Sequence, residues 1–132
     1  MLVLDENISA GEERKLSRWR LRCRVVGVHF ASKGAGDPDF IPLLLRLPRP
    51  TFITADRDFW RARLCHSGYA IAVVADLAEN EVAVHVRRFL AHPQFDTAGK
   101  RLGRIVRLRP ESIGVFNAPN ARVVSVPWNR AG

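Results

Sequence analysis

The chain has 132 residues, of which 47% are hydrophobic and 26% are charged, and this balance excludes wholesale disorder. Its 21 basic and 13 acidic residues give a formal net charge of +8, which favours a partner with a phosphate backbone. No apolar stretch approaches the roughly 20 residues that a membrane span needs. The first residues form an apolar run followed by acids, which does not resemble a signal peptide. We therefore expect a cytoplasmic protein that does not enter the membrane.

Apolar runs alternate with amphipathic segments through the first two thirds of the chain, which predicts an α/β fold with a mostly parallel sheet. Ser9, followed by Glu12, matches a capping box at the start of a helix. Asp37 before Pro38 matches a helix N-cap, and Pro48 ends that helix. The expected strands are residues 2–4, 24–28, 51–54 and 69–75, and the expected helices are residues 10–20, 40–47, 56–63 and 79–91.

The last third of the chain has a different pattern. Residues 103–108, 112–116 and 121–126 are short apolar runs separated by turn residues. We expect these runs to form an antiparallel β appendage on the same domain. The predicted organisation is thus a single domain over residues 1–132, with an α/β core at 1–92 and a β-rich C-terminal extension at 93–132.

Separated aspartates follow the apolar runs. Asp5 comes after the first expected strand, Asp56 and Asp58 come after the third, and Asp37 opens a helix. The carboxyl ends of parallel strands meet at one edge of a sheet, where ligands bind. Carboxylates gathered there repel one another unless a cation neutralises them, and hard oxygen ligands suit Mg²⁺ or Mn²⁺. The pattern predicts a metal site that could activate water against a phosphate.

Three motifs raise the specificity of this prediction: Leu-Val-Leu-Asp-Glu-Asn (2–7), Gly-Ala-Gly-Asp (34–37) and Ile-Thr-Ala-Asp-Arg-Asp-Phe (53–59). In this order they resemble the PIN-like nucleases, and in particular the VapC-like toxins of bacterial toxin–antitoxin pairs. The likeness covers roughly residues 1–90. It implies a three-layer α/β/α sandwich and a Mg²⁺- or Mn²⁺-dependent endoribonuclease. It also implies restraint by a cognate antitoxin and a possible homodimer.

The resemblance carries over by position. It implies that Asp5, Asp37, Asp56 and Asp58 are the catalytic and metal-binding acids, and that the Thr54 hydroxyl supports them. Glu6 and Asn7 are expected to assist from the loop after the first strand. Broader PIN nucleases usually have a glutamate in the middle segment, where this chain has Asp37 and Asp39. This departure motivates the alternative of a catalytically inactive nucleic-acid-binding or scaffold protein.

Basic residues near the acids are candidates for RNA phosphate contacts, with a solvated helix face as the alternative. They are Arg14, Lys15, Arg18, Arg57 and Arg61. A third interpretation is a phosphoacceptor domain like the receivers of signalling proteins, but the sequence lacks an apolar strand that ends in lysine. Cys23 and Cys65 lie far apart in the sequence, and we expect reduced thiols.

Overall fold

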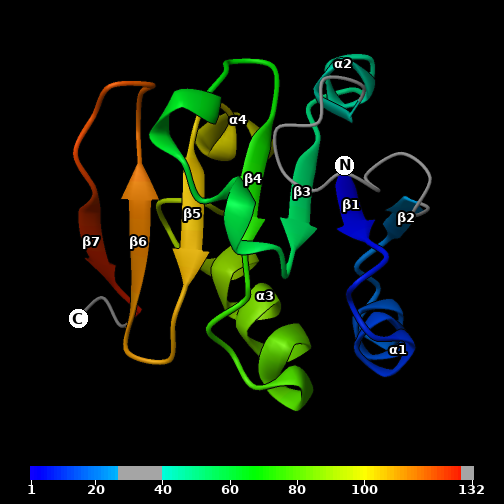
Figure 1. The fold of residues 1–132 in the computed structure, drawn as a ribbon. Coiled ribbons are helices and arrows are strands. Elements are labelled where there is room, and N and C mark those ends of the chain that lie inside the picture. Colours follow the sequence, from blue (N-terminus) through cyan, green and yellow to red (C-terminus); the bar gives the residue numbers. More distant parts are fainter. Residues whose placement is uncertain (27–39, 129–132) are drawn as a thin grey trace.

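The computed structural model describes residues 1–26 and 40–128. Within them, seven strands form one sheet in the order β2-β1-β3-β4-β5-β6-β7 (Figure 1). The strands are β1 (Leu2–Asp5), β2 (Cys23–Val26), β3 (Thr51–Thr54), β4 (Ala70–Val73), β5 (Ile105–Leu108), β6 (Ser112–Phe116) and β7 (Val124–Pro127). The first five strands in chain order pair in parallel, and β6 and β7 are antiparallel to their neighbours. The predicted α/β class with a mostly parallel sheet is confirmed.

Four α-helices and three 3-10 turns connect the described strands. They are α1 (Ala10–Arg18), α2 (Phe40–Leu45), η2 (Arg57–Phe59), η3 (Ala62–Leu64), η4 (Glu79–Glu81), α3 (Val82–Ala91) and α4 (Ala98–Arg101). The helix expected over residues 56–63 is instead two separate 3-10 turns, η2 and η3. The helix α4, which begins after the N-cap Thr97, was not predicted. The residues predicted as a loop at 33–36 and as a helix start at 37–38 lie outside the described part of the chain.

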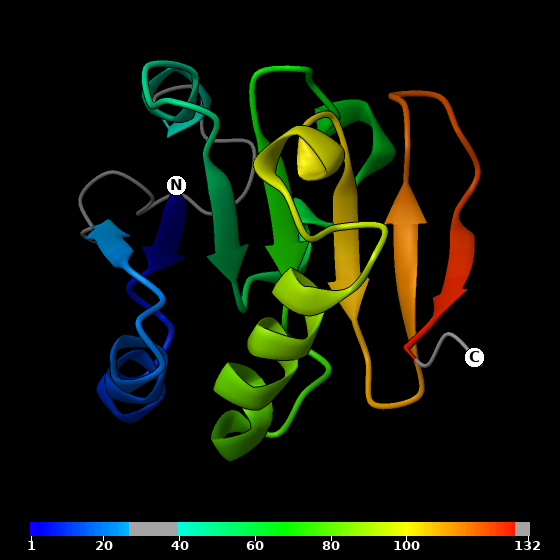
Figure 2. The same ribbon diagram turned by 180° about the vertical axis from the view of Figure 1, so that it is seen from behind.

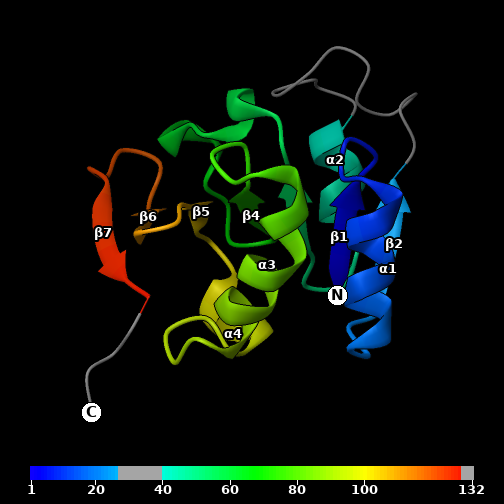
Figure 3. The same ribbon diagram turned by 90° about the horizontal axis from the view of Figure 1, so that it is seen from below.

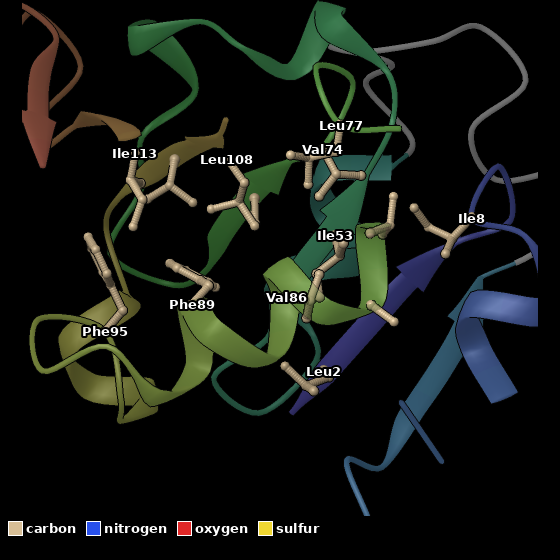
Figure 4. Packing of buried hydrophobic residues seen from close by; sticks show 14 of the residues in the cluster. Leu2, Ile8, Ile53, Val74, Leu77, Val86, Phe89, Phe95, Leu108 and Ile113 are labelled. Carbon is tan, nitrogen blue, oxygen red and sulfur yellow. The ribbon is translucent and has the colours of Figure 1, made fainter. Parts of the chain in front are cut away.

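The sheet separates two hydrophobic clusters because successive strand residues point to opposite faces. Leu4 and Ile53 pack on one face with Leu16 of α1 and Val86 of α3. Figure 4 shows Val86 and Phe89 of α3 directed at this face of the sheet. On the opposite face, Val3 and Phe52 pack with Leu44 of α2 and Phe59 of η2. The helices α1, α3 and α4 therefore cover one face, whereas α2, η2 and η3 cover the other (Figures 2 and 3).

The prediction that three C-terminal strands form an antiparallel appendage is wrong for the first of them, β5. The strand β5 pairs in parallel with β4, with Ala72 opposite Val106, so β5 belongs to the parallel sheet. The reason is that α3 and α4 carry the chain back across the sheet before β5 begins, which makes β5 run in the same direction as β4. Only β6 and β7 are antiparallel, and they continue the same sheet.

Candidate functional site

The carboxyl ends of β1 and β3 meet beside each other in the sheet. Leu4 is opposite Ile53, so the next residues, Asp5 and Thr54, end their strands at the same edge. The chain passes from β1 to β2 on one side, while β3 lies on the other side of β1. Such a reversal of strand order is where open α/β sheets bind ligands. The sequence-predicted pair of Asp5 and Thr54 therefore lies at the expected place in the fold.

One hydroxyl group joins the two acidic segments. Thr54 Oγ1 donates a hydrogen bond of 2.7 Å to Asp5 Oδ2 and accepts one of 3.0 Å from the Asp56 backbone N–H. Asp56 Oδ1 in turn accepts from the Asp58 backbone N–H at 2.9 Å, which caps η2. The Thr54 hydroxyl thus holds both the Asp5 carboxylate and the backbone of the loop that carries Asp56.

A second side chain holds the same loop. Asn7 Oδ1 accepts a hydrogen bond of 3.2 Å from the Ala55 backbone N–H, which ties the segment after β1 to the segment after β3. Glu6 is exposed, and its backbone N–H donates a hydrogen bond to Asp5. The Asn7 side chain therefore positions the backbone of the loop after β3, and its part in a functional site stays a prediction.

The Asp5 carboxyl is only 6% exposed, and its surroundings set its acidity. Burial raises the pKa of Asp5 above the ordinary aspartate value, and the charges of Asp56 and Glu6 add to this increase. Hydrogen bonds from the Thr54 hydroxyl and the Glu6 backbone act in the opposite direction and lower the pKa. A buried carboxylate with a second carboxylate near it is stabilised by a cation, so the electrostatics suit a positively charged ligand.

The donor chemistry at this edge fits Mg²⁺ or Mn²⁺, because such ions take hard oxygen ligands and use one or two carboxylates beside water and phosphate. Asp5 and Asp56 are the two acids that could supply those ligands. Asp58 is less involved, since its side chain is 64% exposed and lies 4.0 Å from Arg61. The fourth predicted acid, Asp37, lies outside the described residues. Among the residues that the structure describes, no group of three or more His, Cys, Asp or Glu side chains could hold a metal ion.

A cavity of about 260 Å³ adjoins the acidic edge. Asn7 and Arg57 line it from the two loops, and Glu79 lines it from η4. Its apolar wall includes Val74 and Leu77. Asp5 and Asp56 do not line the cavity themselves, but Asn7, Ala55 and Arg57 do, so it offers space for a bound group beside the two loops that follow β1 and β3.

Sequence reasoning missed an acid at the same edge. Asp76 follows the apolar run of β4, and its carboxylate faces three guanidinium groups. Arg107 binds it through both Nε and Nη2, with 3.1 Å between Nη2 and Oδ1. Arg57 and Arg109 each lie 3.6 Å away. The hydrogen bond from Arg107 lowers the pKa of Asp76, and the cluster carries an excess of positive charge. The signal was available, because Asp76 follows the apolar run at 69–75 as Asp5 follows the apolar run at 2–4.

The predicted RNA-contacting residues divide into two groups. Arg14 and Arg18 are exposed on α1, and Arg57 and Arg61 are exposed at η2. The Lys15 ammonium group is instead paired within the protein. Its Nζ lies 2.7 Å from Glu12 Oε2 and donates to the Asn80 carbonyl at 3.1 Å. Their role in binding RNA stays a prediction.

Of the two hydrogen bonds of the capping box predicted at Ser9, one is formed. Ser9 Oγ accepts from the Glu12 backbone N–H at 3.3 Å. The Glu12 carboxylate does not return to Ser9 but accepts from the Ala83 backbone N–H at 2.9 Å, at the start of α3. Glu12 is 4% exposed, so it fastens α1 to α3 in the protein interior.

Both cysteines are free, as predicted, and burial raises the pKa of Cys23 to about 11. No helix in the described part of the chain is both long and apolar enough to cross a membrane. Comparisons of the chain with protein-family models, with curated proteins and with solved structures give no match.

Proposed function

We propose that the protein is a Mg²⁺- or Mn²⁺-dependent endoribonuclease of the PIN-like kind, acting as the toxin of a toxin–antitoxin pair. The observation that carries the proposal is the buried Asp5 carboxylate, held by Thr54 and close to the charge of Asp56 where the strand order reverses. A buried acid in this position has a role that core packing does not explain, because an apolar residue would fill the space without a desolvation cost.

Each residue of the site has a physical task in this proposal. A divalent ion, when bound, supplies the Lewis acid that neutralises the phosphate and makes water a better nucleophile. Asp5 and Asp56 present anionic oxygens to that ion, and Thr54 keeps the Asp5 oxygen in a fixed orientation. Water would attack phosphorus in line, the P–O bond to the departing ribose oxygen would break, and that oxygen would take up a proton.

The arginines would bind the substrate. Arg57 lines the cavity beside the acids, and Arg107 and Arg109 lie close behind it around Asp76. One carboxylate cannot neutralise three guanidinium groups, so positive charge remains for RNA phosphates. Such contacts give affinity without sequence choice, since phosphates carry no base information.

The cleavage assay uses the purified chain, a mixed-sequence RNA and Mn²⁺. We expect cleavage that EDTA abolishes and that Asp5→Asn reduces to background. Thr54→Val should lower the rate by about 10- to 100-fold, because it disturbs a group that orients a ligand. Glu111→Gln, an exposed acid far along the chain, is the control. Absence of cleavage by the wild-type chain, or equal cleavage by Asp5→Asn, would contradict the proposal.

The toxin assignment has its own test. It rests on the motifs at residues 2–7, 34–37 and 53–59, which also imply a cognate antitoxin and a possible homodimer. We expect expression of the chain alone to arrest growth, and co-expression of a short adjacent reading frame to relieve the arrest. Light scattering of the purified protein reports whether it is a dimer. Unimpaired growth in cells that contain active nuclease would separate the toxin role from the enzymatic one.

A phosphoacceptor domain is the second candidate. The parallel strands have the order β2-β1-β3-β4-β5, which signalling receivers share, and Asp56 follows β3. The cation expected after β5 in that case is a lysine, whereas here Arg109 occupies the position and lies 3.6 Å from Asp76. Incubation with a small phosphodonor distinguishes the two functions: stable labelling that Asp56→Asn abolishes would favour the phosphoacceptor.

A further inference from the structure

A second cavity, of about 410 Å³, lies at the opposite end of the sheet, where β1 begins. It is lined by three arginines, Arg20, Arg22 and Arg101, by one acid, Asp96, and by apolar residues that include Leu21 and Leu90. It is separated from the acidic edge by the length of β1, about 13 Å for a four-residue strand. The cavity is therefore distinct from the candidate metal site.

Arg101 is a buried cation that forms no salt bridge with a described carboxylate, although Asp96 lies near enough to favour its charged form. It is 7% exposed, its Nε donates to Thr51 Oγ1 at 2.9 Å, and its Nη1 donates to the Phe95 carbonyl at 2.8 Å. Nη2 has no hydrogen-bond partner in the described part of the chain. The acid nearest in sequence, Asp96, is paired at 2.8 Å with Lys100. Burial lowers the pKa of Arg101, the charge of Asp96 raises it, and the charge of Arg49 lowers it further. The Arg101 guanidinium therefore shares its nearby acid with Lys100 and has no carboxylate hydrogen-bonded to it among the described residues.

Two further arginines here adopt a backbone conformation that favours glycine. Arg20 has φ of 63° and Arg49 has φ of 47°, and they are the two non-glycine residues with positive φ in the described ranges. Arg20 follows the C-terminus of α1, where glycine is the usual residue. Backbone strain of this type is retained at positions where the side chain has a task. Arg20 lines the cavity together with Arg101, and the charge of Arg49 acts on Arg101 from nearby.

We propose that this cavity binds a terminal phosphate monoester, with Arg101 beneath the phosphate and Arg20 and Arg22 at the rim. Guanidinium groups that converge on one cavity suit a single group with several oxygens and about two negative charges. Internal phosphodiesters carry one charge each and are better matched by cations spread along a face. The ligand is a nucleoside monophosphate or the 5′-phosphorylated end of an RNA, which share this chemistry.

The binding test is carried out with the full chain in EDTA, so that it does not depend on the proposed nuclease activity. Isothermal titration compares AMP with adenosine, and a 5′-phosphorylated tetraribonucleotide with its 5′-hydroxyl form. We expect the phosphate to increase affinity by about tenfold or more, the effect of one strong charge-assisted contact. Binding of AMP and the phosphorylated RNA alike would identify the phosphate alone as the ligand, whereas binding of the RNA only would identify an RNA end. Equal affinity with and without the phosphate would overturn the proposal.

The variant Arg20→Gly separates a binding role from a structural one. It removes one cation and also relieves the positive φ, so we expect weaker phosphate binding together with a higher midpoint of thermal unfolding. Arg122→Gln, which removes the same charge from an exposed position before β7, is the control. If Arg20→Gly weakens AMP binding no more than Arg122→Gln does, the assignment of the cavity is wrong. A cleavage assay that fails while AMP still binds would refute the nuclease proposal alone.

Discussion

The substitution Thr54→Val tests the contact on which the candidate site depends. Thr54 is fully buried, and valine has nearly the same shape, so the change removes the hydroxyl and leaves almost no cavity. The Asp5 carboxylate loses a 2.7 Å hydrogen bond, and the Asp56 backbone N–H loses its acceptor. A hydrogen bond to a charged group contributes about 1.5–3 kcal/mol, and a neutral one about 1 kcal/mol.

We expect a net destabilisation of about 2–3 kcal/mol at pH 8, after allowing for the added apolar methyl group. For a chain of this size, this corresponds to a decrease in Tm of about 6–15 °C. Urea unfolding followed by circular dichroism gives the free energy directly. In the Asp5→Asn background the same substitution should cost at least about 1 kcal/mol less, because the hydroxyl then faces a neutral amide.

The matched control is Thr51→Val, at the other end of β3. Thr51 is 1% exposed, and its hydroxyl accepts from Arg101 rather than contacting Asp5. Its effect should add to that of Asp5→Asn with no coupling. If Thr54→Val also adds to Asp5→Asn with no coupling, the hydroxyl does not stabilise a charged Asp5, and the electrostatic reasoning about the site is refuted.

Three further variants probe charges elsewhere in the fold. Because burial raises the pKa of Asp5, this residue stabilises the fold fully below its unfolded pKa, and the contribution is lost as pH rises through the folded value. Asp5→Asn should thus be more stable than wild type at pH 7 without metal, and urea midpoints from pH 3 to pH 8 test this. The pKa of Asp76 is lowered by Arg107, so its contribution is present above the unfolded pKa and is lost in acid. Asp76→Asn should be less stable at pH 7 and approach wild type near pH 3, and parallel pH profiles would exclude the ion pair as the cause. Glu12→Ala removes the acceptor of the Ala83 amide and should cost about 1–3 kcal/mol in urea unfolding, whereas an unchanged midpoint would show that water replaces it.

The strands that could be predicted from the local sequence are those made of consecutive buried residues. The run Thr51–Thr54 was placed at its observed bounds, because four consecutive buried residues identify a central parallel strand. Asp5 was placed at the strand end for the same reason, and its neighbour Thr54 followed from the motif. The positions of the strand and of these two residues could be predicted because they depend on adjacent residues, whereas the function of the site stays a prediction.

Predictions that depend on distant contacts were less successful. The apolar pattern of β5 identifies a strand but not its direction, which depends on where α3 returns the chain. Glu12 matched a local capping pattern, yet its carboxylate binds an amide 71 residues away. Asp76 was overlooked because its three arginine partners come from two separate segments of the chain. In each case the deciding partner lies far away in the sequence.

The position of β5 between β4 and β6 makes the C-terminal third indispensable to the rest of the protein. A fragment ending at residue 92 would expose the whole backbone edge of β4 and uncover the apolar face that Ile105 and Val106 now shield. Unpaired edges of this kind recruit strands from other molecules. Such a fragment should accordingly self-associate or precipitate, so a shortened chain is better made by removing β7 alone.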